Sequence, residues 1–179
     1  MKKLFLLLMM MLLPLAANAY DAKVDGIFYN LSGTEAEVTY KKEGKLSYSG
    51  VVTIPSSITY KGKTYNVTSI GSNAFNGCVD LTSVTIPNSV TSIRDWAFYK
   101  CSGLASVDIP NSVKDIGEGA FDSSGLKSIT IPNSLTSVGV AAFEGCKGLT
   151  SVTIPNSVTT IGEYNQEIKG ETNVEIIPV

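Results

Sequence analysis

The chain has 179 residues, of which 44% are hydrophobic and 17% are charged, and its formal net charge is −2. It contains no histidine, which excludes Ser-His-Asp and Cys-His catalysis, histidine-containing zinc sites and histidine proton shuttles. The 14 Lys and Arg residues are scattered among 16 Asp and Glu residues, so the sequence lacks the clustered positive charge that binds nucleic acid. We therefore expect no enzymatic activity, no cofactor and no nucleic-acid partner.

Residues 1–19 have the pattern of a secretory signal peptide. A positive start at Lys2 and Lys3 precedes an apolar run, and Ala17 and Ala19 give the small residues that a signal peptidase accepts before Tyr20. The apolar run is shorter than the roughly 20 residues of a membrane span, and no second run of that length follows. The sequence therefore predicts a secreted or cell-surface protein that has no membrane span once the signal is removed.

Residues 20–53 are strand-like and are interrupted by turn signals at Asp25-Gly26, Ser32-Gly33 and Glu43-Gly44. A further hairpin is predicted over residues 58–70, with its turn at Gly62. We expect residues 20–53 to form an N-terminal antiparallel β cap that covers the first edge of the structure that follows.

The rest of the chain is repetitive. The pair Ile-Pro begins at Ile54, Ile86, Ile109, Ile131 and Ile154, and the last three spacings are 23, 22 and 23 residues. The first spacing is longer because about nine residues are inserted around residues 60–65. A fixed period of this length is the signature of a repeat architecture, and we place the repeats at residues 54–163.

Each unit predicts one coil of a solenoid. Residues 81–86 alternate polar and apolar side chains before a proline, which indicates a short strand with Val84 and Ile86 facing inward. The residues after the proline begin a return path, and Ala97, Phe98 and Cys101 then form a turn or a single helical coil. One coil cannot bury its own apolar side chains, so the coils must stack. The expected fold is a mostly β solenoid with a parallel strand ladder and short turns or 3-10 coils.

Two apolar columns are expected to run through the core of this stack. One consists of Phe75, Phe98, Phe121 and Phe143, and the other of Ile86, Ile109, Ile131 and Ile154. The unit resembles the BspA-like leucine-rich repeats of bacterial surface proteins, because its L-x-x-V-x-I-P-N-S-V-T-x-I-G-x-x-A-F-x-x-C pattern recurs in several copies. The lead-in over residues 24–29 and 37–40 is also similar to that family. The resemblance implies a right-handed solenoid used for adhesion to host matrix proteins or to other cells.

Residues 164–179 depart from the repeat pattern. Asn165-Gln166 stands where Ala-Phe is expected, although Val174 and Ile176 follow Val152 and Ile154 by 22 residues. We interpret this segment as a degenerate last repeat or C-terminal cap. The alternative is that further repeats have been lost from the gene.

Candidate reactive groups have structural interpretations. Cys78, Cys101 and Cys146 occupy one interior column, where they are expected to be small buried side chains, and a disulfide between the first two is the alternative. A metal site is not expected, because there is no histidine and no C-x-x-C pair. The acidic residues form no recurring pair, which argues against a two-carboxylate glycosidase.

The outward positions of the strands form the first candidate binding surface. Two hydroxyl-rich columns are predicted there, one of Ser83, Ser106, Ser128 and Ser151 and the other of Thr85, Asp108, Thr130 and Thr153. Such a surface could read extended protein segments or glycans through many weak hydrogen bonds. Equally, serine and threonine could simply keep a β surface soluble while favouring the strand.

A second candidate surface comes from residues that the repeats do not share. One unit carries Arg94, Trp96 and Tyr99 where the others have smaller side chains, and these three residue types are enriched in interface hot spots. Packing of Trp96 over the adjacent coil is the competing interpretation.

These observations favour a non-catalytic binding module that contacts a protein or glycan ligand, including extracellular matrix. The alternative is a structural, self-associating protein of the cell envelope without a specific host ligand. The sequence leaves the oligomeric state open.

Overall fold

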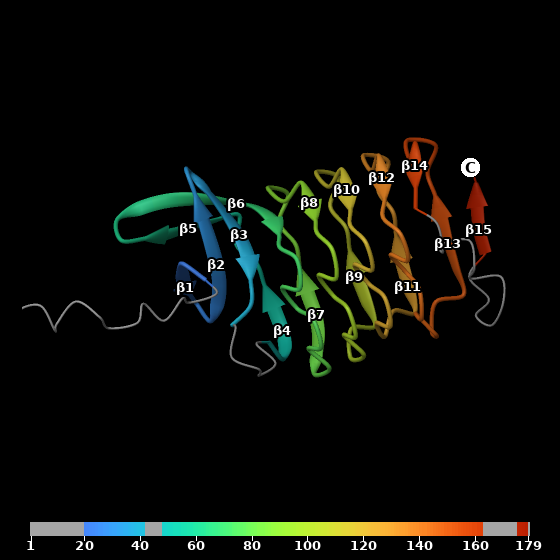
Figure 1. The fold of residues 1–179 in the computed structure, drawn as a ribbon, viewed down its shortest axis with the longest axis horizontal. Coiled ribbons are helices and arrows are strands. Elements are labelled where there is room, and N and C mark those ends of the chain that lie inside the picture. Colours follow the sequence, from blue (N-terminus) through green and yellow to red (C-terminus); the bar gives the residue numbers. More distant parts are fainter. Residues whose placement is uncertain (1–19, 42–47, 163–174, 179) are drawn as a thin grey trace, which may run out of the picture.

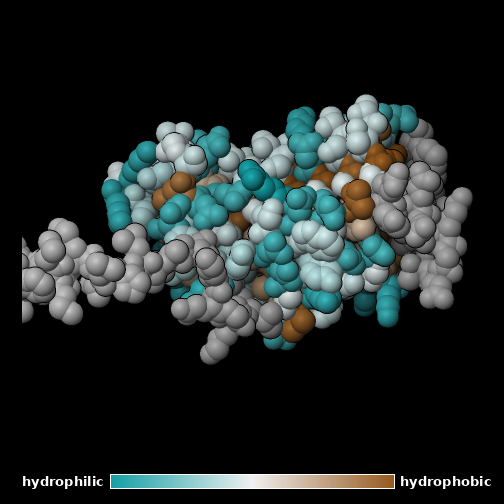
Figure 2. Space-filling view, viewed as in Figure 1, coloured by the Kyte–Doolittle hydropathy of each residue, from teal (hydrophilic) through white to brown (hydrophobic). Residues whose placement is uncertain are grey.

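The computed structural model describes residues 20–41, 48–162 and 175–178. The regular elements in these residues are all β-strands, and Figure 1 shows them as coils stacked along one axis. Figure 2 shows the same side as a space-filling view, in which hydrophobic residues form only small patches among hydrophilic ones. The expected β solenoid is therefore confirmed. Within the described residues, no helix is long and apolar enough to cross a membrane.

The N-terminal cap is antiparallel, as expected. Strands β1 (Ala22–Val24), β2 (Ile27–Ser32) and β3 (Glu35–Thr39) pair in chain order. The turn between the first two strands has positive φ at Asp25 (48°) and Gly26 (84°), a conformation that asparagine, aspartate and glycine adopt most easily. Tight turns at two of the positions that the sequence predicts thus join the three strands of the cap.

A second hairpin joins the cap to the repeats. Strands β5 (Ser57–Tyr60) and β6 (Lys63–Ile70) pair antiparallel about Lys61 and Gly62, which both have positive φ. The end of β6 then pairs in parallel with β3, so that Ile70 lies opposite Val38. The predicted hairpin is confirmed, and its second strand starts the parallel stack.

One side of each coil carries the predicted strand. These strands are β4 (Gly50–Thr53), β7 (Leu81–Thr85), β9 (Ser106–Asp108), β11 (Ser128–Thr130), β13 (Ser151–Ile154) and β15 (Glu175–Pro178). We call their outward surface the strand face. They pair in parallel as β4–β7, β9–β11 and β13–β15. The hydrogen-bonded ladder on this side is therefore made of separate pairs.

A continuous ladder lies on another side, which the sequence predicted only as the start of a return path. It consists of β6, β8 (Ser92–Ile93), β10 (Asp115–Ile116), β12 (Ser137–Val138) and β14 (Thr160–Ile161), all paired in parallel. We call this the second ladder. Its two-residue strands place Ile70, Ile93, Ile116 and Val138 side by side in the core.

The third side, which we call the turn wall, consists of residues 71–78, 94–101, 117–124 and 139–146. These segments form turns and no 3-10 helix. Backbone hydrogen bonds join each turn to the next, for example from Phe75 N to Ala97 O (2.8 Å) and from Phe98 N to Ala120 O (2.7 Å). The turns therefore stack almost as regularly as strands do.

The predicted phenylalanine column fills the centre of the molecule. Phe75, Phe98 and Phe121 stack with ring centroids 4.9 and 5.1 Å apart and nearly parallel planes. The column continues into the cap through Tyr48, which lies 4.6 Å from Phe75 and 6.0 Å from Phe28. Aromatic packing thus joins the cap to the repeats in a single core.

The cysteines behave as small buried side chains. Cys78, Cys101 and Cys146 are buried, and none of the three forms a disulfide. In the shortened third unit Ser124 takes this position, and its hydroxyl lies 3.3 Å from the Cys146 sulfur.

Strand β15 pairs in parallel with β13, the strand of the last regular repeat. Ile176 pairs with Val152 and Ile177 with Thr153, so the alignment of Ile176 with Ile154 was wrong by two residues. A shift of two residues leaves the alternation of side chains unchanged, which is why the sequence pattern could not distinguish the two registers. The expected boundary at residue 164 lies outside the described residues.

Candidate binding surfaces

The two predicted polar columns lie together on the strand face. Ser128 pairs with Ser106, and Thr130 pairs with Asp108, in β11 and β9. Ser83 is half-buried, and the other seven members, which are Thr85, Ser106, Asp108, Ser128, Thr130, Ser151 and Thr153, are exposed. Asp108 is the only ionisable member, so these columns form a nearly uncharged, hydroxyl-rich surface.

The strand face extends one strand beyond the prediction. Val51 pairs with Ser83 and Thr53 with Thr85, since β4 lies beside β7. Val51 is 70% exposed, and it adds an apolar member to the serine column. The Val52-Thr53-Ile54-Pro55 sequence repeats Val84-Thr85-Ile86-Pro87 and could have revealed this strand.

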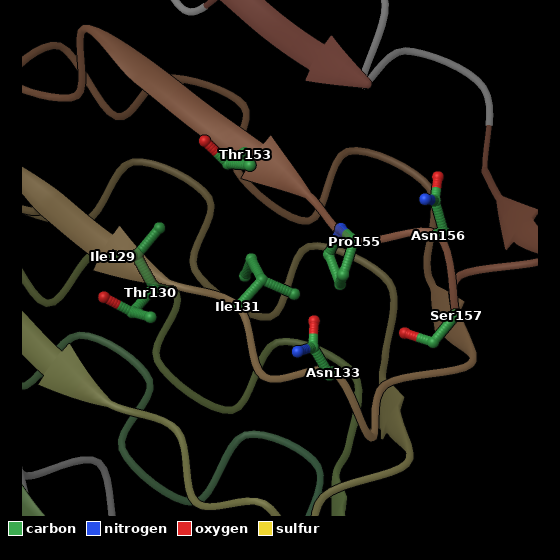
Figure 3. Close-up of a pocket in the computed structure, with 8 residues that line it drawn as sticks. All are labelled: Ile129, Thr130, Ile131, Asn133, Thr153, Pro155, Asn156 and Ser157. Carbon is green, nitrogen blue, oxygen red and sulfur yellow. The ribbon is translucent and has the colours of Figure 1, made fainter. Parts of the chain in front are cut away.

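A groove of about 440 Å³ opens at the edge of the strand face, where β11 and β13 lie side by side without strand pairing. Figure 3 shows that two successive coils supply its lining. The lining residues are Ile129, Thr130, Ile131, Asn133, Thr153, Pro155, Asn156 and Ser157. Ile129 is partly exposed here, whereas its equivalents Val107 and Val152 are 3% and 2% exposed.

The chemistry of the groove is neutral. Its threonine hydroxyls and asparagine amides can both donate and accept hydrogen bonds, and Ile129, Ile131 and Pro155 give it an apolar component. No ionisable side chain lines it. Such a surface is suited to uncharged polar groups, such as peptide main chain or sugar hydroxyls.

The second predicted surface is divided by the structure. Arg94 lies toward the cap, where its Nε is 2.9 Å from Glu37 Oε2 in β3. Trp96 and Tyr99 lie on the turn wall and make an edge-to-face contact with centroids 5.1 Å apart. Trp96 also covers Gly119 of the next coil, which agrees with the packing interpretation. Arg94 thus contributes to joining the cap and the repeats, while Trp96 and Tyr99 remain together.

Two of the buried thiols, those of Cys101 and Cys146, are poor nucleophiles. Burial, together with the neighbouring Cys78, raises the pKa of the Cys101 thiol to about 12, and burial also raises the pKa of Cys146. The Cys101 sulfur donates to the Phe75 carbonyl at 3.0 Å. Because the thiolate is the reactive species, these groups have a packing role. The described residues contain no cluster of Cys, Asp and Glu that could hold a metal ion.

Comparison with known proteins agrees with the repeat architecture. The BspA type leucine rich repeat region matches residues 52–167 in six copies. No curated protein matches the chain.

Among solved structures, a leucine-rich repeat protein from Bacteroides ovatus is 38% identical with a TM-score of 0.74, over 89% of this chain and 41% of that one. A leucine rich cell surface protein from Faecalibacterium prausnitzii is 26% identical with a TM-score of 0.52, over 79% of this chain and 50% of that one. The pneumococcal vaccine antigen PcpA is 21% identical with a TM-score of 0.63, over 87% of this chain and 48% of that one, and it supports the fold alone.

This chain therefore spans between two fifths and a half of the length of these three proteins. The family match covers well over half of the sequence. The parallel ladders and the aromatic column both follow from the same stacked repeat. The chain belongs to the BspA-type leucine-rich-repeat family.

Proposed function

We propose that this protein is exported and acts as a non-catalytic adhesion module, which binds host matrix proteins or other cells through its strand face. Membership of the family suggests a protein-binding surface module. The single observation that carries the finer proposal is the strand face itself. Its serine and threonine columns are exposed except for the half-buried Ser83, carry a single ionisable residue and are continuous with a neutral groove.

The physical argument rests on the cost of removing polar groups from water. Hydroxyl and amide groups lose hydration on binding and regain hydrogen bonds only with a partner that offers matching donors and acceptors. A regular array of such groups therefore discriminates by hydrogen-bond pattern more than by charge. Extended peptide segments and glycans both present such patterns, and we propose these as the contacted groups of the ligand.

The test is binding of the purified protein to immobilised matrix proteins and glycans, with variants on two sides of the solenoid. Thr130→Lys places a long cation in the groove and is expected to weaken binding at least tenfold. Thr91→Lys makes the same change at an exposed residue beside the second ladder, and it should leave binding unchanged. Equal loss in both variants, or no binding by the folded protein, would contradict the proposal.

Export requires its own experiment. If residues 1–19 are a signal peptide, the protein recovered from the producing cells should begin at Tyr20 and should be found outside the cytoplasm. N-terminal sequencing of the recovered protein and fractionation of the cells measure both properties. A chain that begins at Met1 and remains in the cytoplasm would contradict export without affecting the binding proposal.

A further inference from the structure

The turn wall carries an aromatic pair that the repeat architecture does not require. At the position of Trp96 the neighbouring coils have Asn73, Gly119 and Ala141, and all four residues adopt positive φ, between 53° and 61°. Glycine and asparagine tolerate this conformation, but a bulky aromatic residue adopts it at a cost of about 1 kcal/mol or more. The coil therefore holds its largest side chain at a position where small residues serve the fold equally well.

Trp96 is held in a defined orientation. A Cβ atom on Gly119 would lie 2.6 Å from both Cε3 and Cζ3 of the indole, so the six-membered ring lies directly over that glycine. Tyr99 meets the indole at an interplanar angle of 85°. Both side chains are partly exposed. The result is a rigid aromatic surface, which loses little conformational entropy when a partner binds.

Carboxylates lie around this surface on the adjoining turns. The Trp96 backbone N–H donates to the Glu118 backbone carbonyl at 2.8 Å, and the exposed Glu118 directly precedes the glycine that the indole covers. Asp95 lies between the two coils, because its Oδ1 accepts a hydrogen bond from Glu118 N at 2.9 Å. The cations of the same turn have partners of their own, because Arg94 is paired with Glu37 and Lys100 interacts with Asp122. The negative charges of Asp95 and Glu118 therefore remain beside the aromatic pair.

A lysine already contacts one of the two rings of this surface. Lys100 lies with its Nζ 4.8 Å from the centre of the Tyr99 ring, and lysines also lie over Phe28, Tyr60 and Tyr65. Among the residues that the structure describes, none of the cation contacts found is to Trp96. Tryptophan is the aromatic residue that binds cations most strongly.

We propose that Trp96 and Tyr99, together with the carboxylates of Asp95 and Glu118, bind a basic segment of a partner protein and place a Lys or Arg side chain against the indole. The charge of the site selects a cationic ligand, and the aromatic pair gives the apolar anchor that is frequent at protein interfaces. The site lies on the turn wall, so this proposal does not depend on the strand face.

Intrinsic fluorescence gives a direct test, because Trp96 is the only tryptophan in the sequence. The protein is titrated with a synthetic peptide of alternating Ser and Arg, and with the same peptide carrying Gln in place of each Arg. We expect the first peptide to change the Trp96 emission saturably and the second to leave it unchanged. Equal responses to both peptides, or no response to either, would overturn the proposal.

Variants separate this site from unspecific attraction between charges. Glu118→Gln removes one charge with little change in shape and should weaken binding of the arginine peptide about threefold, whereas Asp108→Asn on the strand face should not alter it. Trp96→Phe keeps an aromatic ring but should weaken binding several-fold, measured by the anisotropy of a labelled peptide. Circular dichroism confirms that each variant is folded. An equal loss in Glu118→Gln and Asp108→Asn would refute a specific site, and unchanged affinity in Trp96→Phe would refute the role of the indole.

Discussion

Gly117 lies where one coil passes close to the backbone of the preceding coil. A Cβ atom there would lie 2.5 Å from Asp95 N and 2.7 Å from the Arg94 carbonyl carbon. We expect Gly117→Ala to lower the free energy of unfolding by about 2 kcal/mol or more, because the coils must move apart. Gly62→Ala is the control, since its Cβ would meet nothing within 4 Å and only the strain of its φ of 76° remains, about 1 kcal/mol. Urea denaturation compares the two, and equal losses would contradict the steric explanation.

The buried Cys101 thiol makes stability depend on pH in the alkaline range. Burial raises its pKa from 9.0 to about 12, so between these values the unfolded chain releases a proton that the folded chain retains. Stability is therefore fully present below pH 9 and falls as the pH rises, by up to about 1.4 kcal/mol per pH unit from this group.

The variant Cys101→Ala is expected to make this decline shallower, although it lowers stability at neutral pH by creating a cavity. Part of the slope should remain, because burial also raises the pKa of Cys146 and of Tyr48. Denaturation midpoints between pH 8 and 11 measure the effect. Parallel pH profiles for the two proteins would show that Cys101 does not contribute.

At the scale of elements, Tyr48 joins the cap to the repeats. Its ring packs between Phe28 and Phe75, and its hydroxyl accepts from Phe28 N at 3.1 Å and donates to the Thr39 carbonyl. Tyr48→Phe keeps the packing but leaves two buried backbone groups unpaired, so we expect a loss of about 2 kcal/mol. Tyr40→Phe changes a 37% exposed residue and should cost little. Thermal unfolding compares the two variants, and equal stabilities would show that the Tyr48 hydroxyl does not stabilise the attachment of the cap to the repeats.

The sequence predicts those elements whose residues recur with the period. Phe98 and Ile109 could be placed in core columns because equivalent residues stand 22 or 23 positions away. Tyr48 has no such counterpart, so its place in the aromatic column depends on tertiary packing alone. The second ladder was missed because a two-residue strand such as Ser92–Ile93 is too short to show alternation.

The candidate surfaces also divide into a part that the repeat pattern predicts and a part that depends on tertiary contacts. Ser106 and Thr130 were placed on one face because the alternation of a strand determines where side chains point. The separation of Arg94 from Trp96 depends on contacts with Glu37 and Gly119, which belong to the cap and to the following coil. Neighbours of that kind cannot be read from a single repeat.

At the scale of the whole molecule, stability should grow with the number of coils, because each coil is buried by its neighbours. Inserting a second copy of residues 86–108 after Asp108 is expected to give a folded protein with a higher denaturation midpoint. The control carries Phe98→Asp in the inserted copy, which breaks the aromatic column within the added coil. A midpoint that falls with the intact insertion would contradict additive stacking.

The walls of the solenoid also differ in their mechanical properties. The second ladder is joined continuously from β6 to β14, whereas the strand face consists of the pairs β4–β7, β9–β11 and β13–β15. Bending that spreads β7 from β9, or β11 from β13, breaks no strand pairing, while the same bending along the second ladder would break backbone hydrogen bonds. We therefore expect the solenoid to open more easily on the strand face than along the second ladder, and we expect a tensile load to widen the groove between β11 and β13 before it disrupts the core.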